Sequence, residues 1–176
     1  MDCATREVYT VRVDSAGVTA PYSNFMAYLP VPLRNVVGAE LLTATLKPQY
    51  SNAMSHVYVE ELVSNFITRA SPAYTTGLGT TTSNVGVATL VANQGIVERA
   101  FVSIPTSNIA VGNDGFVLWN QATDFPTDIE YINPIRQLKT LTISFYDGKT
   151  GLPQTMNDVS YFTFRIYCAK NNKCDY

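Results

Sequence analysis

The chain has 176 residues, and its 12 basic and 14 acidic side chains give a formal net charge of −2 at pH 7. Only 15% of the residues are charged, well below the roughly 25% of an average soluble chain. This slightly acidic balance argues against a nucleic-acid groove, which needs clustered Lys and Arg, and the apolar fraction of 46% excludes intrinsic disorder.

Uncharged polar residues replace the missing charge, with 20 Thr, 13 Asn and 11 Ser. Residues that favour strands (Val, Ile, Thr, Tyr, Phe and Trp) total 67, whereas those that favour helices (Ala, Leu, Met, Glu, Gln, Lys and Arg) total 54. The excess predicts an all-β protein, and the length suits a single domain over residues 1–176. No apolar run approaches the roughly 20 residues of a membrane span, so we expect no membrane insertion.

Eight apolar or alternating segments lie between turn signals and are predicted to be strands. In chain order they are Glu7–Val13, Phe25–Leu29, Arg34–Lys47, His56–Val63, Gly95–Ile104, Gly115–Trp119, Gln137–Asp147 and Val159–Cys168. Pro30 and Pro32 separate the second segment from the third, and a Thr- and Gly-rich stretch, Ala73–Asn84, is predicted to be a surface loop. A single helical turn is predicted near Ala122–Ile132.

The last two segments show the clearest period of two, which gives each strand one buried face. Leu141, Ile143 and Phe145 should point inward in the seventh segment, and Phe162, Phe164, Ile166 and Cys168 in the eighth. Asp147-Gly148 and Gly151 are expected to supply positive φ angles for the turn between them. Eight antiparallel strands in one compact chain predict two packed sheets, most economically a single eight-stranded jelly roll.

Residues that could carry catalysis are few, and we expect neither an enzyme nor a metal or cofactor. The one histidine, His56, could bind a metal together with Glu60 and Glu61, but a ring that packs within a strand is far commoner. A nucleophilic Ser or Cys would need that same histidine as its base. Asp124, Asp128 and Glu130 could form the acid–base pair of a glycosidase, although no aromatic groove accompanies them.

Other short motifs have ordinary explanations. Gly148-Lys149-Thr150 resembles the end of a phosphate-binding loop, but Ile143 stands where the required earlier glycine should be. Asn113-Asp114-Gly115 lacks the ladder of acids of a calcium loop and is read as a turn. Trp119 could stack on a sugar. The cysteines are Cys3, Cys168 and Cys174; they are interpreted as free thiols, while a local Cys168–Cys174 bridge stays open.

Four stretches, read in order, carry a resemblance to a known family. They are VYTVRVDSAG with SNFMAYLPVPLRNVVGAELLTATLKP, then HVYVEELVSN, then ERAFVSIP, and finally INPIRQLKTLTISFYDGKTG with SYFTFRIYC. Together they resemble the single jelly-roll penton and related minor capsid proteins of nucleocytoplasmic large DNA viruses, particularly the algal, chlorella-virus-like group. The chain departs from that family at Tyr146, which directly precedes Asp147-Gly148 where Asp-x-Asp-Gly is common, and in the unmatched stretch Tyr74–Asn93.

The resemblance implies a structural virion protein, a homopentameric penton capsomer that closes the fivefold vertices of an icosahedral capsid. Its partners would be trimers of the major capsid protein and other minor capsid proteins, with assembly in the host cytoplasm. Two alternatives remain: a minor capsid or cement protein between or beneath capsomers, and a carbohydrate-binding jelly-roll module. Tyr74–Asn93 and Asn108–Trp119 are the candidate loops for contacts between subunits.

Overall fold

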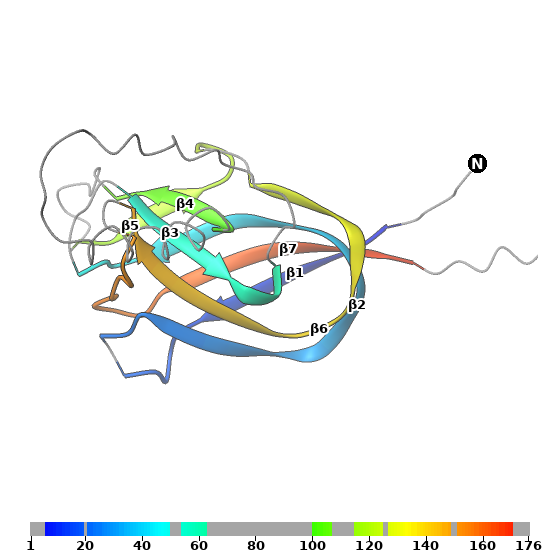
Figure 1. Ribbon diagram of the computed structural model, residues 1–176, viewed down its shortest axis with the longest axis horizontal. Coiled ribbons are helices and arrows are strands. Elements are labelled where there is room, and N and C mark those ends of the chain that lie inside the picture. Colours follow the sequence, from blue (N-terminus) through cyan, green and yellow to red (C-terminus); the bar gives the residue numbers. More distant parts are fainter. Residues whose placement is uncertain are drawn as a thin grey trace, which may run out of the picture.

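The computed structural model describes residues 6–19, 21–49, 54–62, 100–106, 115–124, 127–148 and 151–170. They form one antiparallel sheet (Figure 1), which confirms the all-β prediction. Its strands are β1 (Arg6–Asp14), β2 (Asn24–Leu46), β3 (Met54–Val59), β4 (Val102–Pro105), β5 (Val117–Asn120), β6 (Asp128–Asp147) and β7 (Tyr161–Ala169), and a short 3-10 helix, η1 (Glu60–Leu62), follows β3. The strand order is β1-β7-β2-β6-β3-β4, with β5 paired to β2.

The two long strands, β2 and β6, bend together and carry the sheet around on itself, as the right-hand side of Figure 1 shows. Their pairing changes register twice, between Tyr28 and Leu33 and again between Val36 and Gly38. At the first shift β2 contributes the extra residues, and at the second β6 does. Such irregularities bend a strand and increase its twist, so the corner of the sheet lies where both strands bulge.

The bend divides the sheet into two halves. The β1–β7 half consists of β1, β7 and the second part of β2, with β5 and the beginning of β6 on the far side of β2. The β3–β4 half consists of the first part of β2, the remainder of β6, β3 and β4. Each long strand therefore belongs to both halves.

The inner faces of the two halves meet in an apolar core, and a run of aromatic rings joins them. The ring of Phe162 in β7 lies 6.0 Å from that of Phe145 in β6 and 6.2 Å from that of Phe25 in β2, and Phe101 lies 5.7 Å from Phe164. β7 pairs with neither β6 nor β4, and with β2 only from Val36 onward, so these contacts cross the interior rather than follow the sheet. The inward residues predicted for the last two strands are all buried.

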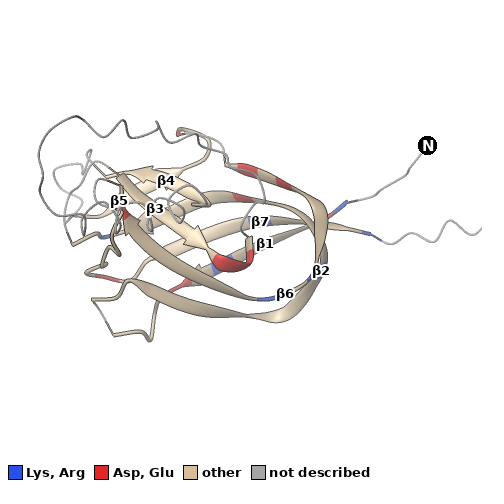
Figure 2. Ribbon diagram, in the orientation of Figure 1, with Lys and Arg blue, Asp and Glu red and all other residues tan. Residues whose placement is uncertain are grey.

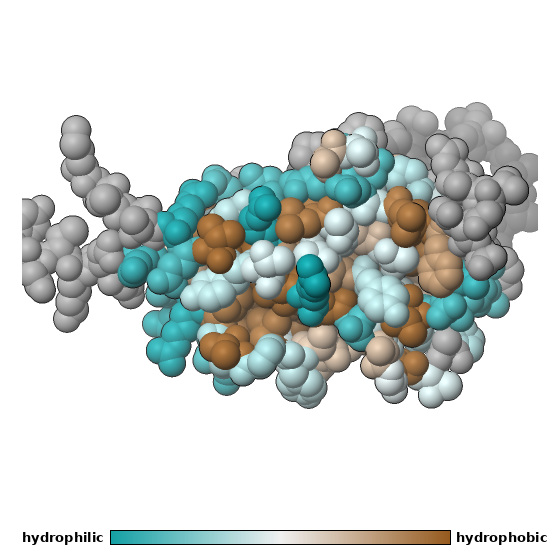
Figure 3. All heavy atoms as spheres, turned by 180° about the vertical axis from the view of Figure 1, so that it is seen from behind, coloured by the Kyte–Doolittle hydropathy of each residue, from teal (hydrophilic) through white to brown (hydrophobic). Residues whose placement is uncertain are grey.

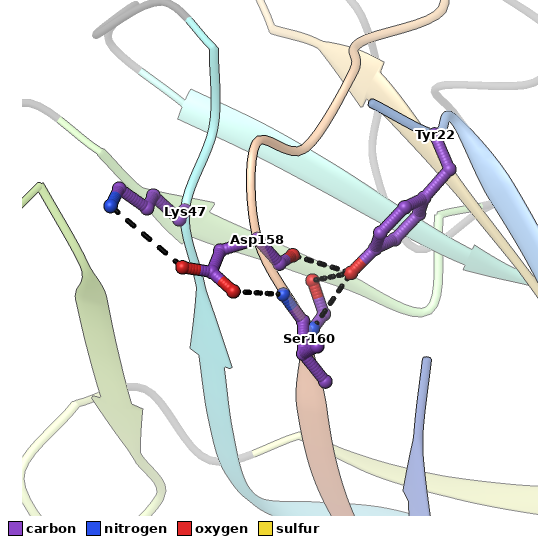
Figure 4. A network of polar contacts seen from close by, with 5 residues as sticks. Tyr22, Lys47, Asp158 and Ser160 are labelled. Carbon is purple, nitrogen blue, oxygen red and sulfur yellow. Dashed lines mark hydrogen bonds and ion pairs between the residues drawn. The ribbon is translucent and has the colours of Figure 1, made fainter. Parts of the chain in front are cut away.

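A polar network ties the start of β2 to the segment before β7 (Figure 4). The hydroxyl of the buried Tyr22 donates a hydrogen bond to the carbonyl oxygen of Asp158 (2.5 Å) and accepts one from the backbone N–H of Ser160 (2.8 Å). The hydroxyl of Ser15 also contacts that of Tyr22 and accepts from the same N–H at 2.9 Å. The carboxylate of Asp158 lies 3.8 Å from the ammonium group of Lys47. The network thus pins the β1–β2 connection against the end of the β6–β7 connection.

Three sequence predictions need correction. The predicted strands Phe25–Leu29 and Arg34–Lys47 are a single strand, because Pro30 and Pro32 lie where the register shift already interrupts the ladder, so that no strand hydrogen bond is lost. The predicted helical turn is wrong: β6 begins at Asp128, and residues 121–123 form a turn.

The third correction concerns Gly148, which does not have a positive φ, unlike Gly151 at 67°. Glycine is needed at position 148 for space, since a Cβ would lie 2.7 Å from Cβ of Met54 and 2.9 Å from its carbonyl oxygen. That carbonyl accepts a hydrogen bond from the N–H of Gly148 at 2.9 Å. The β6–β7 turn therefore packs its backbone directly against the start of β3.

Candidate subunit interface

The outer face of the β1–β7 half is a regular lattice whose rows follow from the strand register. Residues directly opposite one another share a face of the sheet, so each row contains one residue from every strand that it crosses. From one end to the other, the outward rows are Arg6 and Ala169; Val8, Tyr167, Gly38 and Glu130; Thr10, Arg165, Glu40 and Asp128; Arg12, Thr163, Thr43 and Asn120; and Asp14, Tyr161, Thr45 and Leu118.

The face is apolar or weakly polar at several exposed positions. Leu118 is 64% exposed, Val8 54% and Tyr161 51%, and the threonines lie between them. Figure 3, which views the molecule from behind Figure 1, shows brown and pale side chains across the middle of the surface and most of the strongly hydrophilic ones along its borders. Charged residues form short coloured segments on otherwise tan strands in Figure 2, and they occupy seven of the eighteen lattice positions, namely Arg6, Arg12, Asp14, Glu40, Asp128, Glu130 and Arg165.

The central charge on this face is the carboxylate of Glu40, which is buried although it lies on the outer side of the sheet. One carboxylate oxygen accepts hydrogen bonds from Nη1 of Arg165 (2.6 Å) and from the hydroxyl of Tyr167 (2.7 Å), and the other accepts one from Nε2 of Gln121 (2.8 Å). Burial by itself would raise the pKa of Glu40, but these hydrogen bonds and the guanidinium charge outweigh it, so that the pKa is lowered. Glu40 is therefore a carboxylate at neutral pH, neutralised within the face.

Gly38 makes room for this arrangement. A Cβ on Gly38 would lie 3.4 Å from the ring of Tyr167 and 3.1 Å from the carbonyl oxygen of Ile129, so the ring packs closely against the bare backbone. The hydroxyl of Tyr167 donates a hydrogen bond to Glu40, and this hydrogen bond raises the pKa of Tyr167. On the same face the guanidinium of Arg6 forms an exposed ion pair with Glu130 at 3.1 Å. Two of the charges of each sign thus find partners within the surface itself.

These properties suit a contact with another protein subunit. The face spans four neighbouring strands, about 19 Å, and nine residues of β1, about 30 Å, which gives an area on the order of 600 Å². A standard interface buries about 800 Å² on each partner, so the face supplies most of one side. A neighbouring subunit that covers this face would not bury unpaired charges at Glu40 and Arg165, because these two residues already form an ion pair with each other.

Most residues singled out by the sequence have other roles. His56 is buried in β3, and its Nδ1 lies 2.8 Å from the hydroxyl of Ser103 in β4. Glu61 accepts hydrogen bonds from the backbone N–H of Thr142 (2.6 Å) and from its hydroxyl (2.8 Å), which anchors η1 to β6. Within the described ranges no group of three or more His, Cys, Asp or Glu side chains could hold a metal ion.

The acidic cluster of the glycosidase alternative does not converge on one site. Asp124 accepts a hydrogen bond from the N–H of Asn120 (2.8 Å) and shapes a turn, Glu130 pairs with Arg6, and Asp128 lies beside Glu40 in the register. These carboxylates belong to a turn and to the outer lattice.

Trp119 cannot stack on a sugar, because it is buried at 3% exposure, whereas Leu118 beside it points outward. Cys168 is also buried, and burial raises the pKa of its thiol, which makes it a poor nucleophile. Cys3, Cys174, Ala73–Asn84, Tyr74–Asn93 and residues 108–114 of the second candidate loop lie outside the described residues. The sequence did not single out Glu40, Arg165 or Tyr167, because their meeting depends on strand register.

A cavity of about 300 Å³ opens at the bend, between the beginning of β1, the end of β7 and the corner of β2. Glu7 dominates its polar lining, accepting a hydrogen bond from the hydroxyl of Tyr9 (2.8 Å) and lying 3.8 Å from the ammonium group of Lys170. Two of its three charged lining residues, Glu7 and Lys170, thus pair with each other, Arg34 being the third, and the outer face remains the better candidate for a functional surface.

The comparisons with known proteins supply no identification: no protein-family model matches the chain, and no curated protein matches it. Among the described residues, no helix has the length and apolar character needed to cross a membrane. Any function must therefore be argued from the fold and its surface.

Proposed function

We propose that this chain is a structural capsid protein of a large DNA virus, a single jelly roll that forms the pentameric capsomer at the icosahedral vertices. The strand pairing supports the jelly-roll part of the proposal. If the two parts of β2 are counted separately, one half reads β1, β7, second part of β2 and β5, and the other reads first part of β2, β6, β3 and β4. Two four-stranded layers that exchange strands at one corner are what a jelly roll requires.

The observation that carries the functional part is the outer face of the β1–β7 half. This face exposes Leu118, Val8 and Tyr161 among threonines, and the charge of Glu40 is neutralised by residues of the same chain. Exposed apolar side chains of this kind are typical of a surface that contacts another protein. Leu118 belongs to Asn108–Trp119, one of the two loops that the sequence analysis named as candidates for subunit contacts. A ring of five copies needs such a face on every subunit, because each copy contacts one neighbour through one surface and the other neighbour through a different surface.

Native mass spectrometry of the purified chain tests the ring. We expect a species of five times the chain mass of 19.4 kDa at micromolar concentration. The Leu118→Asp variant should dissociate it, because the new carboxylate would be buried without a partner. Tyr28→Asp is the matched control, since Tyr28 is 77% exposed but lies in the first part of β2, in the β3–β4 half.

A monomer or trimer at all concentrations would contradict the vertex role and favour the minor capsid or cement alternative. A Leu118→Asp variant that stays pentameric while Tyr28→Asp dissociates would place the interface on the other half. Location on the particle is tested by a map of the virion, in which the chain should occupy the fivefold vertices.

A further inference from the structure

One edge of the sheet is long and, within the part of the chain that the structure describes, unpaired. β1 lies at the end of the strand order, so no described strand pairs with its outer side, and its nine pairs with β7 run without a register shift. It contains neither proline nor glycine, and its middle, Val8–Val11, carries no charge. The edge strand at the opposite end, β4, has four residues and ends at Pro105, which is how proteins usually blunt an edge.

The sequence of β1 is complementary to itself in one antiparallel register. In a regular antiparallel pair, the backbone groups of two residues directly opposite point either both toward the partner strand or both away from it, so β1 can pair with a second β1 only in registers that differ by two residues. The register centred on Thr10 pairs all nine residues and places Arg6 of each strand opposite Asp14 of the other, twice by symmetry. It also sets Tyr9 opposite Val11, a favourable aromatic and β-branched pair.

The neighbouring registers are worse. Shifting one way places Arg6 opposite Arg12 at two symmetric positions, and like charges directly opposite are destabilising. Shifting the other way shortens the overlap and leaves Arg6 and Glu7 outside it. Charge and the length of the overlap together therefore select the register centred on Thr10.

We propose that the free edge of β1 binds the β1 edge of a second copy of this chain, antiparallel and centred on Thr10, so that the two sheets become continuous. The contact is isologous, unlike the contacts within a ring, and does not depend on the proposed capsid role. A contact between two strand edges alone buries less surface than a standard interface, which buries about 800 Å² on each partner. The isolated pair is consequently weak, and an assembly that holds many copies together would strengthen it.

Cysteine cross-linking traps such a weak contact. In a background with Cys3 and Cys174 replaced by Ser, the Thr10→Cys variant would place two thiols on the twofold axis with Cα atoms about 4.5–5.5 Å apart, within the range of a disulfide. The Arg12→Cys variant is the matched control, since its two Cα atoms would be separated by about 13 Å along the strands. Under mild oxidation we expect a disulfide-linked dimer with Thr10→Cys and none with Arg12→Cys. Equal cross-linking of both variants, or of neither, would overturn the proposal.

Charge reversal tests the register independently. Arg6→Glu alone and Asp14→Arg alone each set like charges opposite one another, so each should lower cross-linking of the Thr10→Cys variant at least severalfold. A mixture of the two should restore it, because Glu at position 6 then faces Arg at position 14 and the native Asp14 faces the native Arg6. Arg6 also pairs with Glu130 within its own chain, so Glu130→Gln serves as a control that should leave cross-linking unchanged. Failure of the mixture to cross-link would refute the Thr10-centred register.

Discussion

Replacing Tyr22 by Phe removes one buried hydroxyl group and leaves the aromatic ring in the core. Tyr22 is 6% exposed, and its ring centroid lies 6.2 Å from that of Phe25. The carbonyl oxygen of Asp158 loses its hydrogen bond from the hydroxyl, whereas the N–H of Ser160 keeps the hydroxyl oxygen of Ser15 as an acceptor. With one part-buried acceptor deprived of its donor, we expect a loss of about 1–2 kcal/mol in the free energy of unfolding.

Thermal unfolding followed by circular dichroism measures this loss. For a chain of this size, 1 kcal/mol shifts Tm by roughly 2–4 °C, so Tyr22→Phe should lower Tm by about 2–8 °C. Tyr28→Phe makes the same chemical change at a residue that is 77% exposed and should leave Tm unchanged. If Tyr22→Phe unfolds at the wild-type temperature, the hydroxyl network does not stabilise the fold and the reasoning is refuted.

A double-mutant cycle with Ser15→Ala sharpens the test. Each single substitution leaves the N–H of Ser160 one acceptor, but the double substitution leaves this buried donor with neither of them. The double variant should therefore lose about 1–2 kcal/mol more than the sum of the singles. Strict additivity would show that the two hydroxyls do not share that donor.

Three further predictions concern the interior and the outer face. Because hydrogen bonds lower the pKa of Glu40, the contribution of its carboxylate to stability is complete above the ordinary carboxyl pKa of 4.5 and is lost as the pH falls below that value through the folded pKa. In urea unfolding, the Glu40→Gln variant should therefore lose less free energy of unfolding than the wild-type chain over that acid range, and at neutral pH it should be about 1–3 kcal/mol less stable. Gly148→Ala should cost about 1–3 kcal/mol because its Cβ would lie 2.7 Å from Cβ of Met54 and 2.9 Å from its carbonyl oxygen, and Gly38→Ala should cost less because its closest contact, with the carbonyl oxygen of Ile129, would be 3.1 Å; equal Tm values for the two variants would contradict this order. The thiol of Cys168, in a chain with the other two cysteines replaced by Ser, should react with a disulfide reagent only in denaturant, and rapid labelling of the native chain would show that it is accessible.

The local sequence pattern was sufficient to predict which side chains point inward wherever a strand has one solvent-exposed face and one buried face. The alternation in Gln137–Asp147 and Val159–Cys168 placed Phe145, Phe162 and Phe164 inside, and the structure buries all three. The pattern failed at Pro30 and Pro32, which ordinarily end a strand, because only the pairing with β6 shows that the ladder is already interrupted there. It failed likewise at Ala122–Ile132, where pairing with β2 makes a strand of residues that could have begun a helix.

The candidate interface was less accessible to sequence reasoning. Glu40, Gln121 and Arg165 come from separate parts of the chain, and their hydrogen bonds exist because register places β7 and the β5–β6 turn beside the second part of β2. Trp119 illustrates the same limit, since a strand of four residues has no period long enough to tell which of Leu118 and Trp119 faces the solvent.

The amino-acid sequence by itself determined the class of secondary structure and the inward face of the most regular strands, because β propensity and a period of two act between near neighbours. Only the tertiary structure decided that β2 and β6 run through both halves of the sheet, that Gly148 is required for space, and that Glu40 lies neutralised on an outer face. These features depend on which strands pair and in which register, and that choice is made by contacts between residues remote from one another along the chain.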